Sequence, residues 1–149
     1  MHKDRREIEL IARGVLVADN NLLLCHTRGA WNTYLPGGHI EHGESAPVAL
    51  AREIDEEMGW QVDVESFLGA VEHAYERDGS RICEINLVFS MRTPQADPER
   101  QPPSCEDYIE FQWQPLDELA SASLQPSVLQ TCLPQWLGRA GQAGWASTL

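Results

Sequence analysis

One stretch of the sequence, residues 38–60 (GHIEHGESAPVALAREIDEEMGW), constrains the fold most strongly because its second half carries the signals for both ends of a helix. Ser45 is a good N-cap, and Pro47 is tolerated in the first turn, where the amide groups lack partners within the helix. Gly59 stands where helices commonly end in a left-handed residue. An α-helix turns by about 100° per residue, which places Leu50, Ala51, Ile54 and Met58 on one apolar face that can pack against a core.

Three carboxylates, Glu53, Glu56 and Glu57, fall together on the neighbouring face of this helix. Like charges at the spacing of Glu53 and Glu57 destabilise an isolated helix by roughly 0.2–0.5 kcal/mol. Anions in the last turn also oppose the helix dipole, at about 0.3–1 kcal/mol each. A helix selected for stability alone would carry Lys or Arg there. The cluster suits a hard divalent cation bound through oxygen, and the alternative is a solvated acidic face.

The stretch also fills every fixed position of the pattern G-x5-E-x7-R-E-U-x-E-E-x-G-U, in which U is a bulky apolar residue. In this pattern the chain resembles the Nudix hydrolases; the one mild departure is Trp60, where an aliphatic residue is commoner. An ending typical of these domains, E-x-x-E-F-x-W-x-x-L-x-E-L, extends the resemblance to about residues 7–119. The resemblance implies an α/β (α+β) fold, an α/β/α sandwich with a central mixed β-sheet. It also implies hydrolysis of a nucleoside diphosphate linked to another moiety, with Mg²⁺ or Mn²⁺ as cofactor and a homodimer as one common assembly.

The resemblance assigns roles to individual residues. The implied metal ligands are the carbonyl of Gly38 with Glu53, Glu56 and Glu57. Glu53 would be a ligand or would orient and deprotonate the attacking water. Arg52 and Glu44 would support the site, since a guanidinium holds carboxylates through a fixed fork of donors. One more acidic ligand is expected from outside this stretch; Glu106 leads narrowly over Glu84 and Glu110, and a solvated position is the alternative for each.

Candidate substrate contacts lie on both sides of the helix in the sequence. Arg28 could pair with phosphate oxygens, Trp31 could stack on a base, and Asn32 lies beside them. Tyr75 falls where dinucleoside polyphosphate hydrolases carry a tyrosine, although packing is the favoured explanation for one aromatic residue on an alternating strand. The small size of the chain favours a (deoxy)nucleoside triphosphate or a similar small nucleotide.

Other functions stay open at this point. ADP-ribose or a dinucleoside polyphosphate could be the substrate. The domain could bind nucleotides without turnover, although no carboxylate of the motif is missing, or it could be a structural or interaction domain. An isopentenyl-diphosphate isomerase-like reaction would need a nucleophilic cysteine, and no local signature marks Cys25 or Cys83 as one.

The length of 149 residues predicts one domain spanning residues 1–149. The net charge of −12 argues against binding to nucleic acid or to an anionic membrane, but not against a polyphosphate that arrives as its metal complex. No C-x-x-C pair occurs among the cysteines, which is typical of thiols in a reducing compartment. The charged N-terminus has no apolar run, so we expect no signal peptide and a cytoplasmic location.

The rest of the chain predicts a sheet with loops and a final helix. Gly14 inside the first strand indicates a bulge or a close backbone approach, and four prolines mark residues 93–104 as a loop. The final helix is expected to be interrupted at Pro134. The expected segments are a hairpin of 11–18 with 22–26, an extended run 61–76, a turn 77–80, an alternating strand 84–91, a strand 109–113, a helix 127–139 and a loose tail 141–149.

Overall fold

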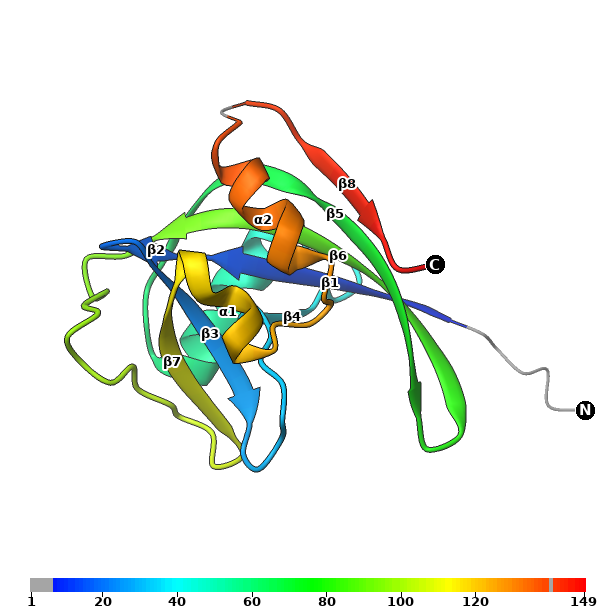
Figure 1. The fold of residues 1–149 in the computed structure, drawn as a ribbon. Helices are drawn as coiled ribbons and strands as arrows, with labels where there is room; N and C mark the ends of the chain where they lie inside the picture. Colours follow the sequence, from blue (N-terminus) through cyan, green and yellow to red (C-terminus); the bar gives the residue numbers. More distant parts are fainter. Residues whose placement is uncertain (1–6, 140) are drawn as a thin grey trace, which may run out of the picture.

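The computed structural model describes residues 7–139 and 141–149, which form two sheets and two α-helices. A five-stranded mixed sheet has the order β4-β1-β6-β5-β8, and a three-stranded antiparallel sheet has the order β2-β3-β7 (Figure 1). The strands are β1 (Ile8–Val15), β2 (Val17–Ala18), β3 (Asn21–Thr27), β4 (Gly37–His39), β5 (Asp63–Arg77), β6 (Ser80–Arg92), β7 (Ile109–Pro115) and β8 (Gly144–Ser147). The helices are α1 (Ala46–Met58), the 3-10 helix η1 (Leu116–Ala122) and α2 (Leu129–Leu137).

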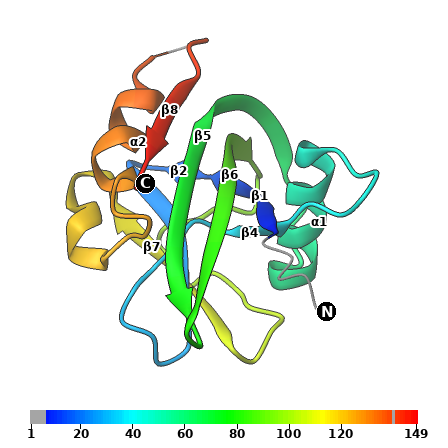
Figure 2. The ribbon, with the colours of Figure 1, turned by 90° about the vertical axis from the view of Figure 1, so that its right-hand side faces the viewer.

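The helices α1 and α2 lie on opposite sides of the strands, which gives the expected layered α/β arrangement (Figure 2). Each helix closes its own apolar cluster. The cluster of α1 contains Ala12, Leu16, Leu23, Cys25, Ala49, Leu50, Ile54, Met58, Trp60, Met91, Ile109 and Phe111. The cluster of α2 contains Val15, Leu22, Leu24, Leu35, Val71, Val88, Leu119, Leu124, Leu129, Cys132, Leu133, Trp136 and Ala146. No helix in the described ranges is long and apolar enough to cross a membrane.

Helix α1 has the ends that its sequence predicts. The Ser45 side chain accepts a hydrogen bond from the amide of Val48 at 3.3 Å. Gly59 takes the left-handed conformation, with φ of 71°, and its amide donates to the Asp55 carbonyl at 2.8 Å. The buried face is the predicted one except that Ala49, rather than Ala51, is fully buried. These local caps fix where the helix carries its carboxylates.

The predicted turn at residues 77–80 joins β5 and β6, the longest strands. Asp78 and Gly79 both have positive φ, 51° and 76°, as a two-residue hairpin turn with the right-handed strand twist requires. On β6 the alternation predicted two faces, and the polar one is the more buried. Glu84 and Asn86 are 7% and 2% exposed, because this face looks into the molecule rather than into solvent.

The prediction of a hairpin between residues 11–18 and 22–26 was largely wrong. Of residues 11–18, only Val17 and Ala18 (β2) pair with β3. Strand β1 instead pairs in parallel with β6 and antiparallel with β4. The chain changes sheets at Leu16, whose carbonyl accepts from the amide of Leu23 at 3.0 Å. Gly14 marks a close approach and no bulge, because its pairing with β6 is regular and an added Cβ would lie 2.5 Å from Met91 Sδ.

The predictions for the C-terminal region also need correction. Residues 144–147 of the expected loose tail form β8, which pairs in parallel with β5. Gly69 and Gly144 allow this approach beside the buried Trp136, since an added Cβ on either would press into the indole. Helix α2 continues through Pro134 instead of being interrupted, so the last turn closes without one amide hydrogen bond.

Candidate active site

The Arg52 side chain on α1 gathers the acidic residues of the motif. Its Nε and Nη2 donate to the two carboxylate oxygens of Glu44 at 2.7 and 2.9 Å, which is a bidentate pair. Its Nη1 donates to Glu53 at 3.0 Å and to Glu56 at 3.4 Å, and Nη2 also reaches the His39 carbonyl at 3.1 Å. Hydrogen bonds from Arg52, and then from the Glu41 amide, lower the pKa of Glu44 to about 2. Glu44 therefore stays ionised and holds the guanidinium in place.

Gly38, in β4, brings its backbone directly against the carboxylate of Glu53. An added Cβ at Gly38 would overlap this carboxylate, falling 2.6 Å from Oε1. Strand pairing with Ala12 of β1 holds Gly38 in position. A glycine is required here because any side chain would displace the Glu53 carboxylate from the backbone of the loop.

Glu57 is the anomalous carboxylate of the helix. Burial, and then the neighbouring charges of Glu53, Glu106 and Glu56, raise its pKa to about 8, while Arg13 opposes the shift. Its Oε2 atom is buried and has no hydrogen-bond partner among the residues that the structure describes. A buried carboxylate oxygen among like charges is costly, and Arg13 offsets only part of this cost, since the pKa of Glu57 stays raised. This orphaned oxygen and the cradle at Gly38 therefore fit an oxygen-ligated divalent ion such as Mg²⁺ or Mn²⁺.

The carboxylates do not converge on a single point in this structure. Within residues 7–139 and 141–149, no three His, Cys, Asp or Glu side chains lie close enough together to hold a metal ion. Arg52 explains part of this separation, because its Nη1 hydrogen-bonds to Glu53 and Glu56 and holds both carboxylates against the guanidinium.

The acidic residues predicted outside the motif occupy three different environments. Glu106 lies near enough to raise the pKa of Glu57. Glu110 is engaged by His26 at 3.0 Å and by Arg28 at 3.2 Å. Glu84 is buried in the wall of a cavity. Only Glu106 is therefore near the helix carboxylates, while Glu84 belongs to a second part of the site.

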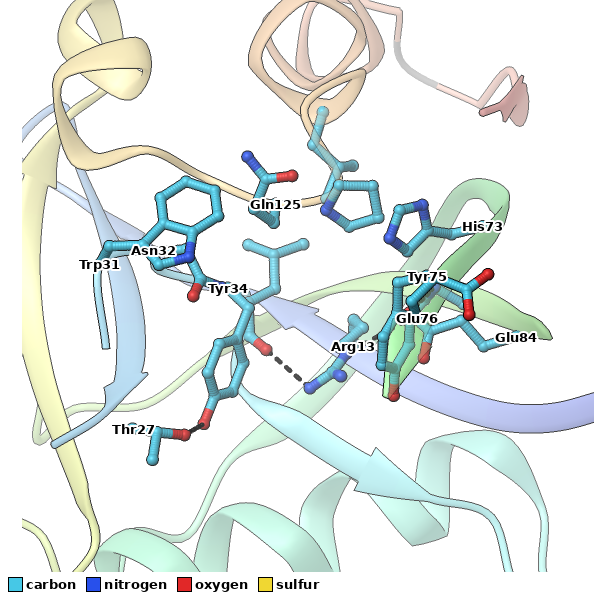
Figure 3. Close-up of a pocket in the computed structure, with 14 residues that line it drawn as sticks. Arg13, Thr27, Trp31, Asn32, Tyr34, His73, Tyr75, Glu76, Glu84 and Gln125 are labelled. Atoms are coloured by element: carbon cyan, nitrogen blue, oxygen red, sulfur yellow. Dashed lines mark hydrogen bonds between the residues drawn. The ribbon is translucent and has the colours of Figure 1, made fainter. Parts of the chain in front are cut away.

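This second part is a cavity of about 540 Å³ (Figure 3). Trp31, Asn32 and Tyr75 line it, as expected of substrate contacts. Arg28 does not line it, because its side chain is 64% exposed and pairs with Glu110. Figure 3 shows Trp31 and Tyr34 on one side and the end of the β5–β6 hairpin on the other.

Arg13 connects the cavity with the carboxylates of α1. It lies in the cavity wall with its guanidinium 5.4 Å from the centre of the Tyr34 ring, a cation–π contact. Its Nη1 donates to the Leu35 carbonyl at 3.0 Å and its Nε to Asn86 Oδ1 at 3.2 Å. Arg13 is also the cation that lowers the pKa of Glu57, so the two parts of the site share one electrostatic environment.

Sequence reasoning did not select several residues of the cavity. These are Arg13, Thr27, Tyr34, Leu35, His73, Glu76, Asn86, Gln125, Pro126 and Leu129. One signal was available, since Glu84 and Asn86 stand at alternate positions within residues 82–89 of β6, which are otherwise apolar. Burial lowers the pKa of His73, against the opposing effect of Glu84 across the strand pair.

Comparisons with known proteins agree with this geometry. The NUDIX domain family model matches residues 9–132. A low-salt glycan biosynthesis protein, Agl8, of Haloferax volcanii is 45% identical over 49 residues, which are 33% of this chain and 30% of that protein. A putative mutator protein, MutT4, of Mycobacterium tuberculosis is 37% identical over 65 residues, 44% of this chain and 26% of that protein. The matched part thus spans less than a third of either relative.

The fold is also that of solved proteins with this domain. The crystal structure of a MutT protein from Methanosarcina mazei Go1 superimposes with a TM-score of 0.70 at 19% identity, over 94% of this chain and 100% of that one. The family match covers most of the chain and includes the helix, the glycine and the carboxylates described above. The chain belongs to the NUDIX domain family.

Proposed function

We propose that this protein hydrolyses a pyrophosphate linkage in a small nucleotide, such as a (deoxy)nucleoside triphosphate, with Mg²⁺ or Mn²⁺ as cofactor. The observation that carries the proposal is the unpartnered, buried Oε2 of Glu57 beside the carboxylates that Arg52 holds. Such an arrangement is costly for stability and useful for binding a cation. Glu53, Glu56 and Glu57 would hold the metal together with the carbonyl of Gly38, and Glu106 would be the acidic ligand from outside the motif.

A divalent ion at this place would neutralise phosphate oxygens that gain negative charge as the bond breaks, and would make water more acidic. The chain itself contributes orientation. Arg52 keeps Glu53 within reach of the Gly38 backbone, and Glu44 keeps Arg52 in place through two hydrogen bonds. Glu53 would act either as a ligand or as the base that orients and deprotonates the attacking water, and its carboxylate lies against the Gly38 backbone, where either role is open to it.

The cavity supports a nucleotide as the substrate. Its volume of about 540 Å³ lies within the ~300–1,000 Å³ typical of small-molecule sites. Trp31 and Tyr75 offer ring faces on which a base can stack, and Asn32 offers an amide for hydrogen bonds. The short chain of 149 residues favours a small nucleotide such as a nucleoside triphosphate over larger substrates.

The test is a hydrolysis panel of nucleoside triphosphates, oxidised triphosphates, ADP-ribose, dinucleoside polyphosphates and nucleotide sugars, each with Mg²⁺, Mn²⁺ or EDTA. We expect metal-dependent release of pyrophosphate or phosphate from a triphosphate, and its loss in Glu57→Gln. The matched control is Glu99→Gln, the same change at an exposed loop position. Turnover of ADP-ribose or a dinucleoside polyphosphate alone would reassign the substrate. Nucleotide binding without turnover would favour a silent binding domain.

A further inference from the structure

The cavity wall contains a buried acid that the proposed hydrolysis does not use. Glu84 lies on β6 and is 7% exposed, and it lines the cavity rather than the helix site. Burying an ionised carboxylate costs several kcal/mol of folding free energy unless hydrogen bonds or an opposite charge compensate for the lost hydration. No salt bridge to Glu84 occurs among the described residues. Its position therefore requires an explanation other than stability.

The neighbouring groups determine how Glu84 can bind a ligand. Arg13 can only donate, so its bond to Asn86 fixes the Asn86 amide with Oδ1 toward the guanidinium. The Asn86 Nδ2 group then donates to Glu84 Oε1 at 3.1 Å. Within residues 7–139 and 141–149, no donor hydrogen-bonds to the other oxygen, Oε2. The chain of hydrogen bonds from Arg13 through Asn86 to Glu84 thus leaves Oε2 of Glu84 as a free acceptor in the cavity wall.

Aromatic rings flank this acceptor. His73 is the cross-strand neighbour of Glu84, and its ring stacks on Tyr75 with centroids 5.8 Å apart and an interplanar angle of 21°. Figure 3 shows His73, Tyr75 and Glu84 together on one side of the cavity, facing Trp31 on the other. A flat ligand between these walls would present its edge, rather than its face, to the carboxylate.

We propose that Glu84 selects a guanine base. Guanine presents two adjacent N–H donors, at N1 and N2. The free Oε2 of Glu84 and the second lone pair of Oε1, which also accepts from Asn86, offer the matching pair of acceptors. Adenine and cytosine place a ring acceptor beside their amino group, and uracil places carbonyl oxygens on both sides of its N–H, so each would oppose the carboxylate. The inference rests on the proposed function in that it takes a nucleotide as the ligand.

The first measurement compares kcat/KM of the wild-type protein for GTP, ATP, CTP, UTP and ITP. We expect GTP to exceed the other four by roughly 10- to 100-fold, because a bound base without the donor pair would cover the cavity-facing oxygen of Glu84 without pairing it. ITP is the decisive comparison, since it differs from GTP only by the N2 amino group. The deoxy form, dGTP, should equal GTP. Equal rates for GTP and ITP, with a loss for dGTP, would assign the carboxylate to the ribose hydroxyls and overturn the proposal.

The second measurement uses Glu84→Gln, which keeps an acceptor for Asn86 and the shape of the side chain. We expect its kcat/KM for GTP to fall to the level of ITP, with ATP changed by less than about threefold. The control is Glu65→Gln on β5, where the carboxylate is 46% exposed and pairs with Arg92. A uniform loss for every nucleotide would contradict base selection, and melting temperatures would identify a variant that fails to fold.

Binding separates this inference from the proposed function. Calorimetry with GMP, IMP and AMP in EDTA measures base preference without turnover. Preference for GMP that Glu84→Gln removes would support base selection even if no triphosphate is hydrolysed, which would refute the proposed function alone. Hydrolysis with equal efficiency for all bases would leave the proposed function intact and overturn the inference.

Discussion

Replacing Glu57 by glutamine should stabilise the metal-free protein above pH 5 while it removes activity. In the folded protein, burial and the charges of Glu53 and Glu106 raise the pKa of Glu57 from 4.5 to about 8. Between pH 4.5 and about pH 8, the Glu57 carboxyl is therefore protonated in the folded state and ionised in the unfolded chain. Proton binding favours the folded state at low pH, and this contribution is lost as the pH rises through 8. Glutamine does not titrate, so the variant has no such loss.

The two pKa values set the magnitude. Linkage between 4.5 and 8 predicts that, from pH 5 to pH 8, the wild-type protein loses on the order of 3 kcal/mol of unfolding free energy relative to Glu57→Gln. For a chain of this length, that difference corresponds to roughly 6–12 °C in melting temperature. The assay is thermal and urea unfolding of both proteins in EDTA across this range. Saturating Mg²⁺ should remove much of the difference, because it binds the ionised carboxylate of the wild type only.

The control for this experiment is Glu56→Gln, one position earlier on α1. The Glu56 side chain is 55% exposed, so water already solvates its charge. We expect this variant to follow the wild-type pH dependence of stability. If wild type and Glu57→Gln keep a constant difference from pH 5 to pH 8, the Glu57 carboxylate is not desolvated as described here, and the argument for a cation at Oε2 fails with it.

Two further predictions concern glycines. Gly38→Ala should lower kcat at least about tenfold with a small change in melting temperature, because the methyl group displaces only the flexible end of Glu53. The control is Gly138→Ala, where an added Cβ meets nothing closer than 3.6 Å. Unchanged kcat in Gly38→Ala would contradict the described contact between Gly38 and Glu53. Gly144→Ala should cost about 1–3 kcal/mol of unfolding free energy with kcat unchanged, because its Cβ would overlap the buried indole of Trp136. Unchanged urea unfolding of this variant would show that β8 is not packed as described.

The parts of the structure that depend on local sequence could be predicted. The ends of α1 follow from Ser45 and Gly59, whose capping contacts lie within four residues along the chain. The turn at Asp78 and Gly79 follows from residues that tolerate positive φ. The motif itself is a fixed spacing on one helix and one loop, so its presence was readable without knowing the sheet.

The parts that depend on distant contacts could not be predicted. The parallel pairing of β1 with β6 and of β8 with β5 joins segments separated by more than 70 residues, and no local pattern selects the partner. The predicted loose tail, residues 141–149, contains Gly144, which instead allows a close approach to Trp136. On β6, alternation identified two faces but not which one is buried, so the cavity role of Glu84 was missed.

The two halves of the site use the two faces of β1. Ala12 points into the cluster of α1, while Arg13, the next residue, lies in the cavity wall. Successive side chains on a strand point to opposite faces. The strand therefore separates the carboxylates of α1, which we propose carry out the hydrolysis, from Glu84 and Asn86, which we propose recognise the base. Arg13 influences both parts of the site: it donates a hydrogen bond to Asn86 in the cavity, and its charge lowers the pKa of Glu57. Because the two functions are on different elements, the cavity can change which nucleotide is bound while α1 and Gly38 keep the same reaction.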